Sequence, residues 1–190
     1  MSEERVLVTG GSGIFATALR KYLPNANYLA HSELNVENSV QLDQCIQKYE
    51  PTIIIHAAAE TRHNAAPVQY LNTNIEGTRK VARLCRIDGA SSPKLVYLST
   101  DFVYPGDALG GYSEQAQCYP VNAYAWSKYF GECFCPAGSL IIRGSLFNPK
   151  KIPRRALTDS WTSKIPVVDA AWYVSRLILS GVAGIFNIGG

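Results

Sequence analysis

The sequence predicts an α/β protein with a doubly wound parallel sheet and helices on both faces. Two observations carry this prediction. Short apolar segments alternate with longer amphipathic segments along the chain, as expected for parallel strands joined by right-handed crossover helices. A glycine-rich turn follows the first apolar segment and polar residues follow a later one, at strand ends where such sheets bind ligands. The 190 residues suit one domain with a core of its own.

The first elements are a strand, a glycine turn and a helix. The strand is expected at residues 5–9 and the helix at residues 14–23, with Gly10-Gly11-Ser12-Gly13 between them. Glycines allow a sharp turn and a close approach to a ligand, and this order of elements directs unpaired helix N–H groups at a pyrophosphate. A tight turn without a ligand is the alternative. The second strand, at residues 28–30, ends without an acidic residue or an arginine, so the choice between NAD and NADP stays open.

The remaining elements continue the alternation. The expected strands are residues 52–56, 94–99, 139–143 and 184–188, and the expected helices are residues 39–50, 67–86, one around 124–128 and one along 167–178. The expected buried positions are Val40, Leu42, Cys45, Ile46 and Tyr49 in the helix at 39–50, and Val167, Ala171, Val174 and Ile178 in the last helix. The apolar strand at 52–56 ends in His56, which we expect to be packed in the core rather than to bind a ligand.

A tyrosine and a lysine, Tyr124 and Lys128, lie four residues apart on the helix expected there. At this spacing both side chains leave the same face of the helix. An ammonium group held close to a phenol lowers the pKa of the tyrosine, because positive charge favours the phenolate. Such a tyrosine can exchange a proton near neutral pH, which an isolated tyrosine does poorly. The alternative is an ordinary solvated helix face.

Composition and charge argue against several classes of function. The net charge of +3 is too small to indicate binding to nucleic acid or to an anionic membrane. No signal peptide is expected, and the apolar residues 165–188 are interrupted by Asp169 and Arg176, which argues against a membrane span. Five irregularly spaced cysteines indicate free thiols in a reducing cytoplasm. Cys133-Phe134-Cys135 lacks a second ligand pair, so no metal site is expected.

Eight short motifs, in order, are similar to those of a known family. They are T-G-G-S-G-I-F-A at 9–16, L-N-V at 34–36, H-A-A-A-E-T at 56–61, N-I-E-G-T at 74–78, Y-L-S-T-D-F-V-Y at 97–104, P-V-N-A-Y-A-W-S-K at 120–128, G-E at 131–132 and R-G-S at 143–145. Over residues 5–147, with a weaker match at 165–190, the chain resembles the extended short-chain dehydrogenase/reductases, and within them the dTDP-4-dehydrorhamnose reductase branch. The resemblance implies a Rossmann fold and NAD or NADP as cofactor.

The resemblance also implies a catalytic set of Thr100, Tyr124 and Lys128, assisted by Asn74. Tyr124 would protonate the carbonyl oxygen of the substrate as hydride arrives from the nicotinamide. Thr100 would donate a hydrogen bond to that oxygen, and Lys128 would lower the pKa of the tyrosine and hold the nicotinamide ribose. Asn74 would help to shape a proton relay. The implied cofactor contacts are Gly10, Gly13, Ile14 and Phe15 at the pyrophosphate, Asn35 and Val36 at the adenine, and Ala57, Ala58 and Ala59 at the ribose, besides Tyr124 and Lys128.

The chain departs from the family pattern on the substrate side. Phe102 stands where the family has a tyrosine, and Leu146 stands where the reductases have a tryptophan that faces the sugar. Relatives carry a substantial C-terminal lobe over the sugar nucleotide, whereas 47 residues follow Arg143 here (190 − 143). We therefore expect a nucleotide-binding domain at residues 1–147 and a minimal remnant of the substrate lobe, packed on the same domain, at residues 148–190.

Three functional hypotheses follow. The first is an NAD(P)H-dependent reductase of a 4-keto sugar nucleotide resembling dTDP-4-dehydrorhamnose, or of a related carbonyl compound. The second is a non-catalytic NAD(P)-binding subunit with a regulatory or scaffold role, which a reduced lobe would favour. The third is a protein that keeps the fold and binds nothing. The resemblance also implies a homodimer, while the preferred cofactor and the individual sugar nucleotide stay open.

Overall fold

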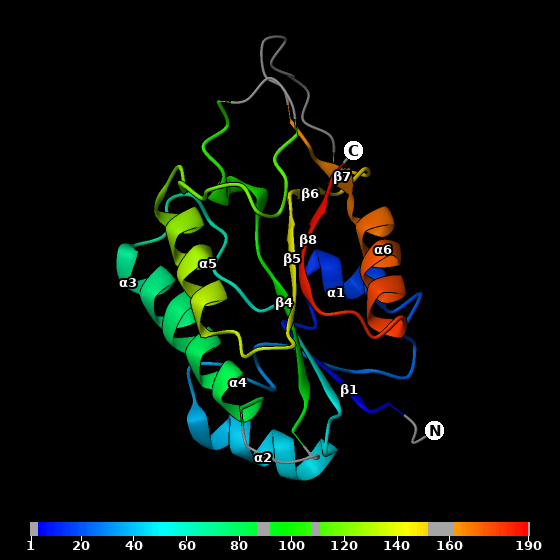
Figure 1. Cartoon of the computed structure of the whole chain (residues 1–190). Helices are drawn as coiled ribbons and strands as arrows, with labels where there is room; N and C mark the ends of the chain where they lie inside the picture. Colours follow the sequence, from blue (N-terminus) through cyan, green and yellow to red (C-terminus); the bar gives the residue numbers. More distant parts are fainter. Residues whose placement is uncertain (1–3, 87–91, 108–110, 152–161, 190) are drawn as a thin grey trace.

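The structure, a computed structural model, describes residues 4–86, 92–107, 111–151 and 162–189. At its centre is a parallel sheet in the strand order β2-β1-β3-β4-β5-β8 (Figure 1). The strands are β1 (Val6–Thr9), β2 (Asn27–Leu29), β3 (Ile53–His56), β4 (Lys94–Leu98), β5 (Leu140–Gly144) and β8 (Gly184–Ile188). Because β2 lies on one side of β1 and β3 on the other, the strand order reverses between β1 and β3. Open α/β sheets bind ligands at such a switch point.

Helices cover both faces of the sheet, which confirms the predicted fold class. The helices are α1 (Ile14–Leu19), α2 (Ser39–Tyr49), α3 (Pro67–Gln69), η1 (Tyr70–Gly77), α4 (Thr78–Leu84), η2 (Asp101–Val103), α5 (Ala123–Phe134) and α6 (Val167–Leu179). Helices α1 and α6 pack together on one face, and α2, α4 and α5 lie on the other (Figure 1). Within the described part of the chain, no helix is both long and apolar enough to cross a bilayer.

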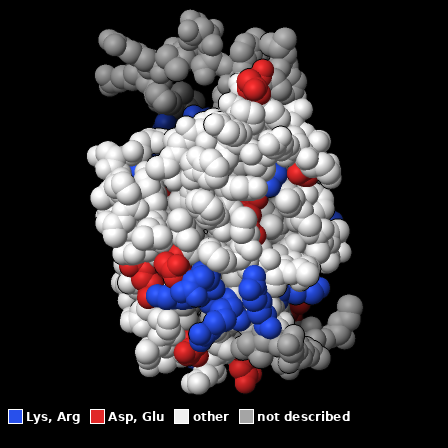
Figure 2. All heavy atoms as spheres, turned by 60° about the vertical axis from the view of Figure 1, so that its left-hand side comes forward, with Lys and Arg blue, Asp and Glu red and all other residues white. Residues whose placement is uncertain are grey.

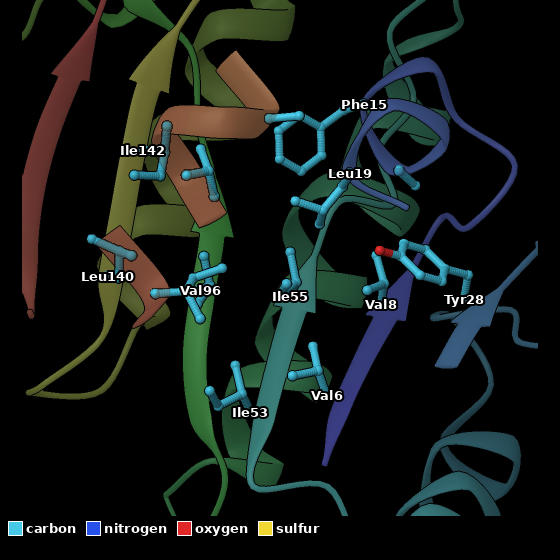
Figure 3. Close-up of a cluster of buried hydrophobic side chains, with 14 of the residues drawn as sticks. Val6, Val8, Phe15, Leu19, Tyr28, Ile53, Ile55, Val96, Leu140 and Ile142 are labelled. Atoms are coloured by element: carbon cyan, nitrogen blue, oxygen red, sulfur yellow. The ribbon is translucent and has the colours of Figure 1, made fainter. Parts of the chain in front are cut away.

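The core has one cluster on each face of the sheet, because successive strand residues point to opposite sides. In the first cluster, Val8 and Ile55 lie beneath Phe15 and Leu19 of α1, and Ile142 extends the cluster along the sheet to β5 (Figure 3). The second cluster includes Leu7, Leu42, Ile54, Val81, Leu95 and Tyr97. All residues of β1 and β3 are buried. This explains why those strands read as continuous apolar runs rather than as alternating patterns.

Two helices differ from the sequence prediction. Val40 is 64% exposed, so its predicted burial is wrong. It lies in the first turn of α2, two residues after the Asn38 cap, which accepts hydrogen bonds from Val40 N and Gln41 N. Only Leu42 of this helix is buried. The helix expected at 67–86 is interrupted by a π-helix, η1, over Tyr70–Gly77. Helices of this type are rare and often mark functional sites.

The segment after β5 forms two kinds of structure. A two-stranded ribbon of β6 (Leu146–Phe147) and β7 (Ile165–Pro166) lies beyond the carboxyl ends of the main strands (Figure 1). Helix α6 and strand β8 then return to the main sheet, where β8 pairs with β5. The segment expected as a lobe remnant thus supplies the last strand of the main sheet. The division into domains at residue 147 stays a prediction.

Candidate active site

The glycine turn fills the switch point between β1 and β3. Gly10 has a φ of +69°, and a Cβ atom there would lie 2.8 Å from the backbone of Ala58. A Cβ atom on Gly11 would lie 2.6 Å from the carbonyl carbon of Tyr28, and the Gly11 N–H donates to Leu29 O at 2.7 Å. Only glycine fits these two positions, because the turn touches the backbone at the ends of both β2 and β3.

The residues that follow the glycine turn form the start of α1, where a pyrophosphate is predicted to bind. Gly13 is the exposed N-cap of α1, and Ile14 is 50% exposed. Phe15 points into the core, as Figure 3 shows, so only its backbone is available to a pyrophosphate. The first N–H groups of a helix have no partner within the helix. Two of the four predicted pyrophosphate residues, Gly13 and Ile14, are therefore exposed, Gly10 is partly buried, and Phe15 can contribute its N–H group alone.

The three alanines after β3 are half-buried and lie against the turn. Ala58 N donates to Thr9 Oγ1 at 3.2 Å, and His56 Nδ1 lies 2.8 Å from the same oxygen. His56 is fully buried, which confirms that it is a packed core histidine. The contacts of Ala57, Ala58 and Ala59 with the cofactor ribose stay a prediction.

Of the two predicted adenine contacts, Val36 is buried and Asn35 is partly exposed. Val36 is 2% exposed and packs against Gly77, where a Cβ atom would lie 2.8 Å from Val36 Cγ2. Asn35 Oδ1 accepts from Glu37 N at 2.9 Å, which closes a turn. Near the end of β2, Glu33 Oε2 accepts from Ala30 N at 2.9 Å. The adenine contacts of Asn35 and Val36 stay a prediction.

Thr100 lies two residues beyond the end of β4 and caps the short helix η2. Its hydroxyl oxygen accepts from Phe102 N at 3.3 Å, and its hydroxyl group donates to Asp101 Oδ1 at 3.3 Å. Asp101 Oδ2 accepts from Ser163 Oγ at 2.6 Å. The single hydroxyl proton of Thr100 is therefore directed at Asp101, and it must turn to reach a substrate oxygen.

Tyr124 lies in the first turn of α5, beside Tyr70 of η1. Their ring centroids are 6.3 Å apart. Burial raises the pKa of Tyr124 to about 12, and the nearby Asp101 carboxylate acts in the same direction. The lowered pKa predicted from the sequence is wrong for the free protein. The reason is the burial of the Tyr124 side chain together with the Asp101 carboxylate, while the Lys128 ammonium lies over the Tyr97 ring.

Lys128 is buried beneath α5, with 2% of its surface exposed. Its Nζ atom lies 4.3 Å from the ring centroid of Tyr97 on β4. Burial lowers the pKa of Lys128 to about 7, against the opposing effects of Cys135 and Glu132. Tyr124 and Lys128 are thus carried by one helix, but they are not in contact through their polar atoms.

Asn74 lies in the π-helix η1 and is fully buried. Its Oδ1 atom accepts from Glu60 N at 2.7 Å, and its Nδ2 atom donates to Glu60 O and to Ser127 Oγ, both at 2.9 Å. Ser127 Oγ in turn donates to Tyr124 O at 2.7 Å. The amide of Asn74 therefore ties η1 to the turn of α5 that carries Tyr124. Its part in a proton relay stays a prediction.

Sequence reasoning missed a buried ion pair behind the site. Arg143 Nη2 lies 2.6 Å from Glu132 Oε2, and Arg143 Nη1 donates to Tyr104 OH at 2.8 Å. Ser99, next to Thr100, donates to the same Glu132 carboxylate. The available signal was one acidic residue, Glu132, on a mainly apolar helix and one basic residue, Arg143, on an apolar strand. Buried charges are usually paired, so these two residues could have been predicted to form an ion pair.

Comparison with known proteins identifies the family. The family described as RmlD substrate binding domain matches residues 4–146. The chain belongs to this family. It is 29% identical to a dTDP-4-keto-6-deoxy-D-glucose reductase of Streptomyces niveus, over 97% of this chain and 72% of that protein. It is 31% identical to a dTDP-4-dehydrorhamnose reductase of Aggregatibacter actinomycetemcomitans, over 83% of this chain and 51% of that protein.

The fold is shared with solved structures of the same family. A dTDP-4-dehydrorhamnose reductase from Bacillus anthracis, solved in complex with NADP, superposes with a TM-score of 0.88 and 29% identity, over 99% of this chain and 76% of that chain. These relatives are named reductases, which confirms the predicted family and the predicted class of NAD(P)-dependent oxidoreductases. The chain spans between about half and three quarters of their lengths.

Proposed function

We propose that this chain is an NAD(P)H-dependent reductase of a 4-keto-6-deoxy sugar nucleotide. The observation that carries the proposal is that the residues after β4 lie close to the first turn of α5. Thr100 lies two residues beyond the end of β4 and Tyr124 lies in the first turn of α5, and the carboxylate next to Thr100 is close enough to raise the pKa of Tyr124. Lys128 lies one turn further along the same helix.

The chain's residues fit a dinucleotide at the switch point. The turn at Gly10 is packed so closely against Ala58 that the backbone itself forms the surface, and Gly13 at the start of α1 is exposed. Backbone N–H groups at such a turn suit a pyrophosphate, and the alanines after β3 leave space for a ribose. When bound, a nicotinamide cofactor supplies the hydride for carbonyl reduction.

Tyr124 is suited to donate a proton. With a pKa of about 12 in the free protein, its hydroxyl group stays protonated across the neutral range and can deliver that proton to a substrate carbonyl oxygen. Thr100 would turn its hydroxyl group from Asp101 towards the same oxygen and stabilise the developing charge there. Lys128 would hold the nicotinamide ribose once the cofactor is bound.

The substrate class rests on the relatives, which are named for 4-keto-6-deoxy sugar nucleotides. The test is oxidation of NADPH by the full chain in the presence of dTDP-4-keto-6-deoxy-D-glucose, followed by absorbance. Turnover is expected, and Tyr124→Phe should lower kcat by about a thousandfold while NADPH still raises the melting temperature. Stabilisation by NADPH without turnover on any 4-keto sugar nucleotide would instead support the non-catalytic subunit, which the named relatives do not favour.

We also propose that the chain forms a homodimer through the outer face of α5. The two charged residues of this helix, Lys128 and Glu132, are both buried, whereas Trp126 and Phe130 are 40% and 46% exposed. Figure 2 brings this side forward, with charged side chains gathered in its lower part and a mostly uncharged surface above. An apolar helix face is usually buried, and a two-fold axis would bring the two copies of one face together.

The dimer can be tested by light scattering of Phe130→Glu. A charge there should convert a dimer to a monomer at micromolar concentration. The matched control is Trp172→Glu, at a residue of similar exposure (45%) on α6 across the sheet, which should leave the mass unchanged. A monomeric parent chain, or a dimer that only Trp172→Glu disrupts, would contradict this interface.

A further inference from the structure

The ring of Tyr97 is a fixed platform beneath Lys128. Tyr97 is fully buried, and its hydroxyl group donates to Lys128 O at 3.2 Å. That hydroxyl occupies the space beside Gly131, where a Cβ atom would lie 2.1 Å from the oxygen. His56 stacks on the ring at a centroid distance of 5.8 Å. The ring is therefore held by its neighbours in the one orientation that presents a face to the ammonium.

The titratable groups around the Lys128 ammonium do not offset the cost of burying its positive charge. Burial lowers the pKa of His56 to about 3, so this β3 side chain is neutral. On α5, Glu132 is the nearest carboxylate along the helix, and Cys135 follows at the helix end, where burial raises the pKa of its thiol to about 12. Both act to raise the pKa of Lys128, but burial outweighs them.

The carboxylate of Glu132 is paired with groups other than Lys128. Its carboxylate binds Arg143 of β5 at 2.6 Å and accepts a hydrogen bond from Ser99 of β4. Tyr124, one turn earlier on α5, is protonated at neutral pH because its pKa is raised. The Tyr97 ring is thus the group that lies directly against the Lys128 ammonium, and it stabilises a positive charge there through a cation–π contact.

We propose that Tyr97 is a positioning residue that holds Lys128 in a buried resting position, and that cofactor binding draws the amine away and takes up a proton. The proposal rests on the NAD(P) site proposed above. A nicotinamide cofactor brings a negatively charged pyrophosphate and ribose hydroxyl groups to this edge of the sheet, and these favour the protonated amine. The buried resting position disfavours it.

The sign of the pH dependence follows from linkage. In the free protein, Lys128 is protonated below its pKa of about 7 and neutral above it. With cofactor bound, the pKa of Lys128 is raised, so the amine is protonated over a wider range. Between the two pKa values the complex holds one more proton than the free protein. The dissociation constant of the cofactor should therefore be constant below about pH 7 and rise about tenfold per pH unit above it.

The experiment is calorimetric titration of the full chain with NADPH from about pH 6 to about pH 9, in two buffers of different ionisation enthalpy at each pH. The difference in heat between the buffers counts the protons taken up. We expect uptake to approach one proton per cofactor at about pH 8, with the stated rise in the dissociation constant. NADP⁺ should show less uptake, because its positive nicotinamide disfavours a neighbouring ammonium.

Three variants assign the effect. Lys128→Arg cannot lose its charge, so proton uptake should vanish and affinity should become independent of pH. Tyr97→Phe keeps the ring and removes only the hydroxyl group, so the pH profile should be unchanged. Tyr97→Leu removes the stabilising ring, so the pH at which affinity begins to fall should move down by about one unit.

The outcomes separate this inference from the proposed function. NADPH that fails to bind at any pH would overturn both. Binding with the same affinity and no buffer dependence across the range would overturn the resting position and leave the reductase proposal standing. Proton uptake that persists in Lys128→Arg would also overturn the resting position. So would a pH dependence of the NADPH dissociation constant that Tyr97→Leu does not shift.

Discussion

The two halves of the carboxyl edge of the sheet are held together by different kinds of contact. At β1 and β3, the turn packs backbone on backbone, with Gly10 against Ala58 so closely that no side-chain atom fits between them, and the side-chain contact between Thr9 and His56 is fully buried. At β4, β5 and β8, polar side chains bridge the strands. Arg143 binds Glu132 and Tyr104, and Tyr104 OH donates to Asn187 Oδ1 on β8 at 2.9 Å.

This difference matches what each half would bind. A surface of close-packed backbone fixes one shape, which suits a cofactor whose pyrophosphate and ribose do not vary. A surface built from side-chain contacts can change one residue at a time, which suits a substrate whose identity varies among proteins of one fold. Changes to the first half should therefore affect cofactor binding, and changes to the second should affect stability or the sugar nucleotide.

The largest effect is expected from Arg143→Met. It leaves Glu132 buried without its partner, and removing one member of a buried ion pair lowers the free energy of unfolding by about 3–5 kcal/mol. Urea denaturation measures the change. The control is Arg79→Met, which breaks the exposed pair between Arg79 and Glu76 (52% and 38% exposed side chains) and should change the free energy by less than about 1 kcal/mol. Equal losses in both variants would refute the role of burial.

Gly10→Ala comes next. Its Cβ atom would lie 2.8 Å from the Ala58 backbone at a φ of +69°, so the variant should lose about 2–3 kcal/mol of stability and bind NADPH at least about tenfold more weakly. Gly106→Ala is the matched control, because Gly106 has a φ of +77° and nothing within 4 Å of the added atom. It carries only the backbone strain, about 1 kcal/mol, and should keep NADPH affinity. The prediction fails if the two variants bind NADPH alike.

The sheet was predictable from sequence because its strands are short, apolar and separated by glycine or proline. The prediction of the glycine turn at Gly10 also needed only local information, since strand, turn and helix are contiguous. The buried stripe of α6 followed from helical spacing, and all four predicted positions, Val167, Ala171, Val174 and Ile178, are buried. These features depend on residues close in sequence.

What sequence could not supply depends on contacts between distant residues. The residues of the π-helix at Tyr70–Gly77 have the apolar spacing of an ordinary helix. The amino-acid composition does not reveal its altered hydrogen bonding. The spacing of Tyr124 and Lys128 placed both on one helix, but the burial of Tyr124 and its neighbour Asp101 depend on how distant segments pack. The pKa of Tyr124 was predicted with the wrong sign for this reason.

The smallest predicted effect tests whether the two halves are independent. Ser163 donates to Asp101 Oδ2 at 2.6 Å, and Asp101 also accepts from Thr100. Ser163→Ala removes one exposed hydrogen bond, so the free energy of unfolding should fall by about 1 kcal/mol or less. With Asp101 less firmly held, Thr100 should be less well placed, and KM for the sugar nucleotide should rise about threefold. The dissociation constant of NADPH should not change. Ser180→Ala, which removes a similar hydrogen bond at the end of α6, should alter neither constant. If Ser163→Ala weakens NADPH as much as the sugar nucleotide, the edge of the sheet acts as one unit and the contrast between its halves does not hold.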